Sequence, residues 1–493
     1  MTVGVDVALF LGAALVLAAV VISALMSRFA TRLRVPGALL FLVLGMIAGE
    51  DVLGLVPLDD FELVQNIGVV ALLFILLEGG LTTKPTDLRL AALPGTLLAT
   101  VGVLVTASVT GAVIWLLVDV DPVTAGLIGA VVASTDAAAV FSMMRSTPLP
   151  RRVAALLRVE SGSNDPIAVM LTVGLLATVE QAASPGAWVW FALVQLVGGA
   201  AVGALVGYGG VLLMRRLHLG IEGLYPIAVA TFGALAYGAA AFVGASGFVA
   251  VYITGLLVGA LLPRHRRSVL GFHEATANAA EIGLFLLLGL LVLPTRLPAV
   301  AVPALLVAVV VTFVARPLAI WLCTLRQGYD WRQRVVLTVA GFKGAVPIVL
   351  ATFPLTAGIE DAALVFDIVF FVVLVSVLVQ GLTLLPVIKL LHLEEPQPAW
   401  SPVAEALPLE DIAVDVVEVH IADHLRIAGR TIGEIAPPTG VVIAAVVRND
   451  RVVVPDGSTT MQVGDVLLLT SQRDTRSLQR ITHWARGESE DDP

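Results

Sequence analysis

Thirteen long apolar runs follow one another between residues 5 and 391, and they constrain the fold more than any other feature. Most are long enough to cross a bilayer core of ~30 Å as helices. Only 14% of the 493 residues are charged and 58% are hydrophobic, which excludes a purely soluble protein. The first run lacks a preceding basic stretch, so we expect a retained helix instead of a cleaved signal. The expected spans are 5–27, 36–50, 61–80, 94–118, 122–145, 152–180, 187–214, 224–243, 246–262, 271–294, 298–325, 333–355 and 363–391.

Lysine and arginine are distributed unevenly between the connections that join these runs. Every second connection is rich in them, whereas the opposite connections carry only Arg296. Because cytoplasmic loops are enriched in Lys and Arg, we expect the amino terminus outside and the carboxyl-terminal segment in the cytoplasm. Six helices and a linking helix would then precede six helices of opposite direction. This is the topology of an inverted-repeat secondary transporter.

Several charged residues fall inside the expected spans, where each costs about 2.5–3.5 kcal/mol at the centre of the bilayer. Such residues belong to an ion pathway or to a paired network. Arg316 has Glu160 and Glu281 as possible ion-pair partners, and Arg158 is interpreted as an interfacial residue. Lys343, Arg316 and Glu281 are interpreted as structural or charge-compensating residues, with a direct role of Lys343 left open. The full set is Asp136, Arg158, Glu160, Asp165, Glu281, Arg316 and Lys343.

Two of the expected spans contain residues that interrupt helices. The fifth span contains Ala-Ser-Thr-Asp at residues 133–136, and Ser, Thr and Asp compete with helical backbone hydrogen bonds. The twelfth contains two glycines and a proline within residues 341–347, a composition typical of kinks. The two spans are equivalent under a seven-helix shift, so we expect two crossing, interrupted helices, a pattern that marks transport sites. Asp136 and Lys343 would then compensate the charges of the half-helix ends.

Three motifs stand out in the membrane-spanning part of the chain: ASTDAAAV at residues 133–140, ESGSNDPIAVMLT at 160–172 and AGFKGAVPIVLAT at 340–352. They resemble the monovalent cation:proton antiporter-1 family, in particular its NhaP-type potassium/proton branch. The resemblance covers residues 5–393 and implies a homodimer in a bacterial cytoplasmic membrane, with a dimerisation domain and a six-helix core that moves like an elevator. It implies that Asp165 binds the monovalent cation or the proton. The other residues implied at this site are Asn164, Thr135, Asp136, Ser161 and Glu160.

The same resemblance bears on stoichiometry and on the choice of ion. An Asn-Asp pair at residues 164–165 implies electroneutral exchange of one cation for one proton, and Lys343 stands where the family often has arginine. We expect potassium/proton exchange, with sodium/proton exchange as the nearest alternative. A gated cation channel and a membrane sensor without transport activity remain further alternatives, although no TVGYG-like filter is present. No enzymatic activity and no nucleic-acid partner are expected.

The charge of the chain changes after residue 393. Residues 394–493 contain 8 Arg and no Lys against 17 Asp and Glu, a net charge of −9, which marks a separate cytoplasmic domain. We expect a proline-rich linker over 394–408, a small α/β regulatory domain over 409–485 and a disordered acidic end over 486–493. Expected strands are 413–421, 441–448, 451–454 and 466–471, and expected short helices are 426–436 and 475–485.

The segment TMQVGDVLLL at residues 460–469 resembles a TrkA-C (RCK_C) domain, a regulatory module of many potassium transporters and channels. This resemblance implies that the tail dimerises, and some similar domains bind nucleotides such as cyclic di-AMP. Passive dimerisation and ligand sensing both remain open, because no phosphate-binding glycine motif is present. No other cofactor is expected. The single cysteine, Cys323, excludes an intrachain disulfide.

Overall fold

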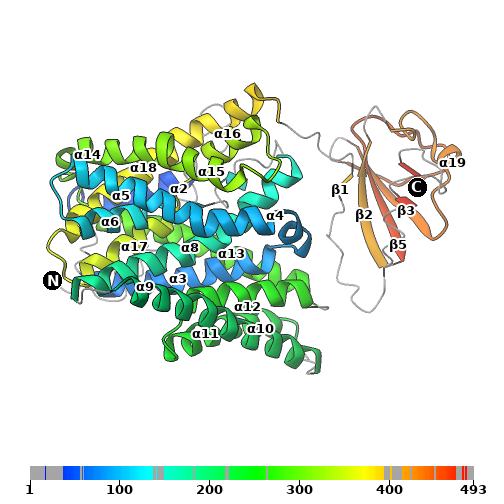
Figure 1. Ribbon diagram of the computed structural model, residues 1–493. Helices are drawn as coiled ribbons and strands as arrows, with labels where there is room; N and C mark the ends of the chain where they lie inside the picture. Colours follow the sequence, from blue (N-terminus) through cyan, green and yellow to red (C-terminus); the bar gives the residue numbers. More distant parts are fainter. Residues whose placement is uncertain are drawn as a thin grey trace. The chain divides into compact units, whose positions relative to one another are not determined.

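The computed structural model describes two compact units, residues 1–394 and 395–493. The first unit is helical and the second contains a β-sheet (Figure 1). The first expected span, apart from residue 17, and the acidic end at 486–493 lie outside the described residues. The described residues are 17, 37–55, 58, 60–136, 140–141, 149–180, 184–216, 221–262, 265–393, 400–401, 414–421, 425–448, 451–472, 480–481 and 484–485.

Long helices that run side by side form the first unit (Figure 1). Three pairs of consecutive α-helices are joined into one continuous rod by a π-helical segment. These segments are η1 (Leu98–Gly102), η2 (Val194–Gly198) and η3 (Val311–Ala315). The α-helices are α2 (Gly37–Ala48), α3 (Phe61–Thr82), α4 (Pro85–Leu97), α5 (Val103–Leu117), α6 (Pro122–Val131), α8 (Arg151–Glu180), α9 (Pro185–Leu193), α10 (Gly199–Arg216), α11 (Leu224–Phe242), α12 (Gly247–Leu261), α13 (Arg266–Leu291), α14 (Leu297–Val310), α15 (Arg316–Thr324), α16 (Trp331–Val339), α17 (Ala345–Thr356) and α18 (Ala362–Leu390).

Capping residues define where several of these helices begin. The Asp60 carboxylate accepts a hydrogen bond of 2.9 Å from the Leu63 amide at the start of α3. The Asp121 carboxylate caps α6, directly before Pro122 at its first position. Aspartate at the N-cap satisfies an amide that has no partner within the helix, and proline at the first position lacks that amide. These polar residues therefore end the preceding loops and start the apolar helices.

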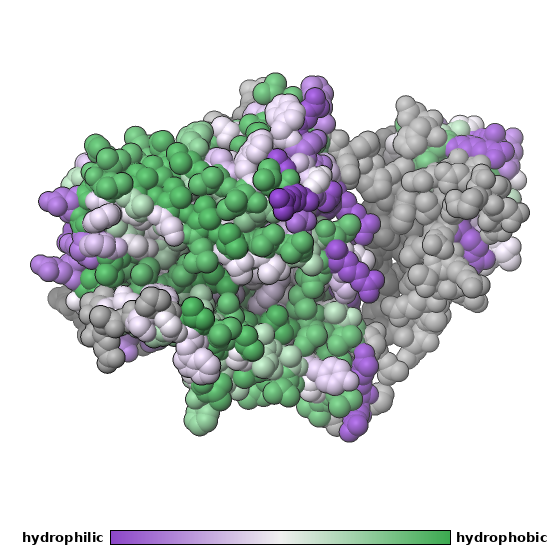
Figure 2. All heavy atoms as spheres, in the orientation of Figure 1, coloured by the Kyte–Doolittle hydropathy of each residue, from purple (hydrophilic) through white to green (hydrophobic). Residues whose placement is uncertain are grey.

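On the face of the helical unit that Figure 2 shows, apolar residues predominate in the middle and hydrophilic residues gather towards the two ends. Seven helices of the described residues are long and apolar enough to cross a membrane, so the protein is a multi-pass membrane protein. Six of the thirteen expected spans are not among these seven. The first, 5–27, lies outside the described residues apart from residue 17. Of the other five, two are interrupted, two are short, and α8 contains a polar segment at residues 161–165. The seven are Phe61–Thr82, Pro85–Leu117, Gly186–Arg216, Leu224–Phe242, Arg266–Leu291, Leu297–Thr324 and Ala362–Leu390.

The helices form two groups, each of which packs chiefly within itself. One group, here called the scaffold, contains α2, α3 and α10 to α13, and the other, here called the core, contains α4 to α6, α8 and α14 to α18. Glycines bring the scaffold backbones into close contact, as small residues do in membrane helices. A Cβ atom at Gly203 would lie 2.4 Å from the Ala250 carbonyl oxygen, and one at Gly80 would lie 2.5 Å from that of Tyr252.

Both expected helix interruptions are present within the core. Helix α6 ends at Val131 and residues 132–136 are not helical, while α16 ends at Val339 and α17 begins at Ala345. The π-helical segments η1 and η3 lie in the rods that precede these interruptions in the two halves of the chain. Segment η1 packs against α15, and η3 packs against α5. Corresponding irregularities thus occur in both halves.

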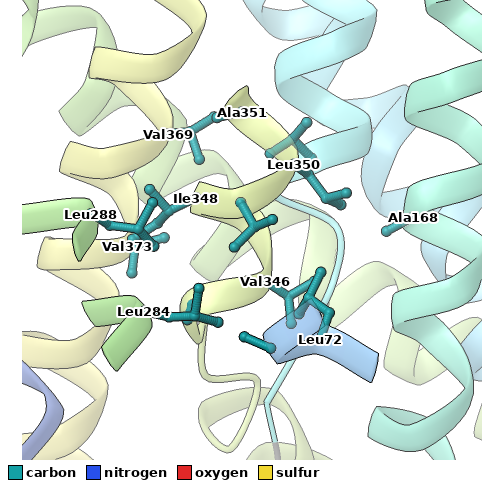
Figure 3. Close-up of a cluster of buried hydrophobic side chains, with 14 of the residues drawn as sticks. Leu72, Ala168, Leu284, Leu288, Val346, Ile348, Leu350, Ala351, Val369 and Val373 are labelled. Carbon is teal, nitrogen blue, oxygen red and sulfur yellow. The ribbon is translucent and has the colours of Figure 1, made fainter. Parts of the chain in front are cut away.

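Helix α17 packs within the largest buried apolar cluster of the helical unit. Figure 3 shows Val346, Ile348 and Leu350 of α17 surrounded by apolar side chains from neighbouring helices. Leu72 of α3 and Leu284 of α13 belong to the scaffold side of this cluster. The contact between core and scaffold at α17 is therefore made largely by aliphatic side chains.

The second unit contains a five-stranded antiparallel sheet of order β1-β2-β5-β3-β4. Strand β1 falls within the segment expected to be only a linker, and it pairs with Glu418 and Val419 of β2. Helix α19 (Ile432–Ile435) is shorter than expected, because Gly429 adopts a positive φ of 75° and ends the preceding turn. The expected helix at 475–485 is described only at 480–481 and 484–485. The strands are β1 (Trp400–Ser401), β2 (Val414–His420), β3 (Val441–Arg448), β4 (Arg451–Val453) and β5 (Val466–Gln472).

Candidate functional site

A cavity of ≈ 370 Å³ lies between the two helix groups of the first unit. It is lined by α3 and α13 of the scaffold and by α8, the start of α17 and the interruption after α6 of the core. Among the described residues that line it, Arg158 is the only cationic one. The acidic lining residues are Glu78, Asp136, Asp165, Glu274 and Glu281. The cavity therefore carries an excess of negative charge and is suited to cations.

Helices α8 and α13 each contribute one helical face to this cavity. Residues at i, i+3, i+4 and i+7 lie on the same side of a helix, and the lining residues of both helices follow this spacing. The stripe on α8 consists of Arg158, Ser161, Gly162 and Asp165, and the stripe on α13 consists of Glu274, Ala277, Asn278 and Glu281. Polar groups on two membrane helices thus face the same cavity.

Asp165 is buried, and one of its carboxylate oxygens has no hydrogen-bond partner among the described residues. Its side chain is 7% exposed and lines the cavity, and its Oδ1 atom has no hydrogen-bond partner among the described residues. The neighbouring Asn164 donates a hydrogen bond of 2.5 Å from Nδ2 to Oγ1 of Thr135, and its Oδ1 atom likewise has no described partner. Buried polar atoms are normally satisfied. These two oxygens are therefore available to a proton or a cation.

The two helix interruptions contact each other directly. The Asp136 amide donates a hydrogen bond of 2.9 Å to the Phe342 carbonyl. Nζ of Lys343 donates one of 2.8 Å to the Ser134 carbonyl. A Cβ atom at Gly344 would lie 2.4 Å from Oδ2 of Asp136, so only glycine allows this approach. The Lys343 ammonium is buried against the carbonyl end of a broken helix, where a positive charge is favourable.

Glu160 and Arg316 form a bidentate ion pair within the core. Nη1 of Arg316 bonds Oε1 of Glu160, and Nη2 bonds Oε2 at 3.1 Å and the Leu337 carbonyl at 3.2 Å. Of the two possible partners of Arg316, the structure selects Glu160. Glu281, the other possible partner, lines the cavity, and its charge-compensating role stays a prediction. Glu160 lies beside the site without lining the cavity.

Arg158, interpreted from the sequence as an interfacial residue, pairs with a buried carboxylate of α4. Its Nη1 atom bonds Oδ2 of Asp87 at 3.0 Å, and its guanidinium lies 4.5 Å from the centre of the Phe141 ring. Glu78 and Glu274, which the sequence did not single out as site residues, line the same cavity. Glu78 carries a visible signal, because it is an acidic residue at the end of the apolar run LLFILL.

The remaining expected site residues lie around Asp165. Thr135 is 5% exposed and is bonded to Asn164. Ser161 and Asp136 line the cavity. Five of the six residues expected at the cation or proton site therefore meet at the cavity or directly behind it. The sixth, Glu160, is held by Arg316.

Comparison with known proteins identifies both units. The family described as "Sodium/hydrogen exchanger, transmembrane" matches residues 16–390, and the TrkA-C domain matches residues 416–482. The chain is 38% identical over 469 residues to the K(+)/H(+) antiporter NhaP2 of Shewanella sp. (strain ANA-3), with coverage of 94% of this chain and 81% of that protein. It is 39% identical over 407 residues to the K(+)/H(+) antiporter NhaP of Alkalimonas amylolytica, with coverage of 81% and 70%.

A solved structure shares the same fold. The sodium proton antiporter MjNhaP1 from Methanocaldococcus jannaschii, determined at pH 8, superposes with a TM-score of 0.68 at 25% identity. The match covers 76% of this chain and 98% of that chain. These findings confirm the resemblance that the three membrane motifs and the tail segment carry. The chain therefore belongs to the sodium/hydrogen exchanger family, with a TrkA-C domain after its membrane-spanning region.

Proposed function

We propose that this protein exchanges potassium for protons across a bacterial cytoplasmic membrane, with Asp165 as the group that carries either ion. The observation that carries the proposal is the unpartnered Oδ1 atom of a buried aspartate that faces an acidic cavity. An isolated carboxylate inside a membrane is unfavourable, so a proton or a cation should neutralise it at each stage. Competition of the two ions for one carboxylate couples their movements.

The neighbouring residues would bind or order the cation. The carbonyl oxygen of the Asn164 side chain and the Ser161 hydroxyl offer neutral oxygen ligands, while Asp136 adds charge from the interrupted helix. Thr135 fixes the Asn164 amide through its hydrogen bond of 2.5 Å. Glu160 would order α8 through Arg316. Lys343 would hold the interrupted segment in place from the side away from the cavity.

We infer that transport occurs by an elevator movement of the core against the scaffold. The scaffold helices are locked through glycine backbone contacts, whereas contacts between core and scaffold are made by side chains. A Cβ atom at Gly68 of α3 would meet the Val349 side chain at 2.7 Å, and one at Gly162 of α8 would meet the Tyr252 ring at 2.5 Å. Side chains can change rotamer during sliding, but apposed backbones cannot.

The proposed assembly and topology follow from the same family. We propose thirteen spans in inverted repeats, an external amino terminus and a cytoplasmic TrkA-C domain, in a homodimer that the scaffold joins. The excess of Lys and Arg in alternate connections supports this orientation. The TrkA-C domain would regulate exchange, and a nucleotide such as cyclic di-AMP is a candidate ligand for it.

The direct test is Asp165→Asn in everted membrane vesicles, with cation-driven proton flux measured separately for potassium and sodium. We expect flux to be abolished, because an amide cannot alternate between a proton and a cation. Asp367→Asn is the matched control, since Asp367 is also 7% exposed but does not line the cavity. Normal flux in a well-expressed Asp165→Asn protein would contradict the proposal.

Sodium/proton exchange is the second candidate, and the solved relative named a sodium proton antiporter favours it. The same vesicles decide between the two ions, because the preferred cation drives proton flux at the lower concentration. A channel would conduct the cation without moving protons, and a sensor would move neither ion.

Electroneutral exchange is a further part of the proposal. The Asn164–Asp165 pair contains one titrating carboxylate, so one proton should leave for each cation that binds. We expect the exchange rate in proteoliposomes to be unaffected by an imposed membrane potential at fixed ion gradients. A rate that changes clearly with potential would indicate electrogenic transport.

A further inference from the structure

Arg158 occupies an unusual position for a cation in a cation transporter. It lies on the same face of α8 as Asp165, seven residues towards the amino end, which is roughly 10 Å along the helix axis. Its side chain is 41% exposed, whereas its partner Asp87 is only 5% exposed. The guanidinium is held from two sides, by the Asp87 carboxylate at 3.0 Å and by the Phe141 ring at 4.5 Å.

The charge of Arg158 opposes the charge of the cavity that it lines. Five carboxylates of the cavity attract cations, and one arginine among the described lining residues repels them. An arginine that served only to join α4 to α8 would not need to face this cavity. Asp87 does not line the cavity, so the ion pair holds the guanidinium against a carboxylate outside the lining.

We propose that Arg158 is a specificity-determining residue that lowers the affinity of the cavity for monovalent cations, and that Asp87 and Phe141 position it. Held at the wall, the guanidinium reduces the negative potential along the path to Asp165 without occupying the path. If it were released from Asp87, the guanidinium would turn towards Glu78 or Glu274. It would then compete with the transported cation for these carboxylates. This inference rests on the proposed cation/proton exchange.

The two members of the ion pair should therefore have opposite effects on cation affinity. Arg158→Gln removes the repelling charge and should lower the KM for the transported cation about two- to tenfold, the size of effect expected for a unit charge at a separation on the order of 10 Å. Asp87→Asn releases the guanidinium and should raise the KM. Both shifts should shrink at high ionic strength. If the ion pair were purely structural, both substitutions would change the KM in the same direction and would lower the melting temperature.

Two controls separate charge from folding. Arg158→Lys keeps the positive charge and should leave the KM close to that of the natural chain. Arg215→Gln makes the same charge change on α10, where the arginine bonds the Leu261 carbonyl outside the cavity, and it should have no effect on the KM. Because Asp87→Asn could fail to fold, the comparison of Arg158→Gln with Arg158→Lys stands without it.

The experiment measures KM and maximal rate of cation-driven proton flux, together with cation-dependent thermal stabilisation of the purified protein. An unchanged KM and an unchanged stabilisation in Arg158→Gln would overturn the inference, as would equal shifts in Arg158→Gln and Arg158→Lys. If the natural chain shows no exchange, the proposed function fails instead. The stabilisation by potassium or sodium salts then still tests whether Arg158 weakens cation binding.

Discussion

The ion pair between Glu160 and Arg316 is the most deeply buried charge pair described beside the candidate site, with side chains 2% and 6% exposed. Removal of one member leaves the other charge buried without a partner, which typically costs about 3–5 kcal/mol. Arg316→Met and Glu160→Leu should each destabilise the protein by about that amount. The double variant should cost much less than the sum. Thermal melting in detergent can measure this double-mutant cycle.

Glu281 supplies the control for this cycle, because it lines the cavity and does not contact Arg316. Arg316→Met and Glu281→Gln should therefore be additive within about 0.5 kcal/mol, as expected for residues without a shared partner. Additivity for the Glu160 pair as well would show that Arg316 does not stabilise α8 through that contact.

A second charged pair, in the TrkA-C domain, makes the stability of that domain depend on pH. Arg448 donates from Nε to Oδ1 and from Nη2 to Oδ2 of Asp465, at 2.8 and 2.7 Å. These hydrogen bonds lower the pKa of Asp465 below its ordinary value. Its charged form therefore stabilises the fold above the unfolded-state pKa of about 3.9. This contribution is lost as the pH falls through the lower folded-state pKa.

The variant Asp465→Asn should remove this pH-dependent contribution. At pH 7 the variant should be less stable than the natural domain, and the difference should shrink as the pH approaches 3. Hydrogen exchange of peptides that cover β5, corrected for intrinsic exchange rates, can follow this in the full chain. An equal loss of protection at both pH values would show that the Asp465 carboxylate acts through packing alone.

At the scale of helices, two glycines of α10 distinguish the effect of close backbone packing on stability from the effect of helix propensity. Gly203 lies against the Ala250 carbonyl, whereas a Cβ atom at Gly209 would meet nothing within 4 Å. Gly203→Ala should destabilise the scaffold by about 1–3 kcal/mol through overpacking. Gly209→Ala on the same helix should be neutral or stabilising by up to about 1 kcal/mol, because alanine favours helix. Equal melting temperatures in detergent would contradict the tight packing of α10 against α12.

The positions of the helix interruptions could be predicted from the sequence, because they depend on local chemistry. Serine, threonine and aspartate at 134–136 and two glycines at 341–344 have low helix propensity. The partner of Arg316 could not be predicted between Glu160 and Glu281. That choice depends on how each helix is rotated about its axis, and only packing against other helices fixes the rotation.

The same limits apply to the tail. Strands β3 and β5 agree closely with the expected ranges 441–448 and 466–471, because apolar residues are concentrated in them, mostly β-branched in β3 and mostly leucine in β5. Strand β1 has only two residues, Trp400 and Ser401, and so carries no periodic pattern. Its pairing with β2 depends on the tertiary structure of the unit. The π-helical segments could not be predicted either, because they lie within apolar runs whose residues do not distinguish a π-helix from an α-helix.

At the scale of the whole molecule, charge and compactness divide the chain at the same place. Residues 1–393 carry 21 Lys and Arg against 21 Asp and Glu, and residues 394–493 carry the net charge of −9. The division of the chain into two compact units falls between residues 394 and 395. Each unit has its own apolar cluster, and the cluster of the second unit includes Val446, Leu467 and Leu469. The units are therefore expected to fold separately.

Truncation after Leu393 tests this separation. All residues proposed to bind the cation or proton precede Lys389, so the truncated protein should insert, fold and retain Asp165-dependent exchange. What should change is its response to pH or to ligands of the TrkA-C domain, because the regulatory unit is missing. Proton flux in vesicles, measured across pH for the full and truncated chains, makes the comparison. Loss of exchange in a truncated protein that keeps its melting temperature and dimerises would make the TrkA-C domain part of the transport mechanism itself.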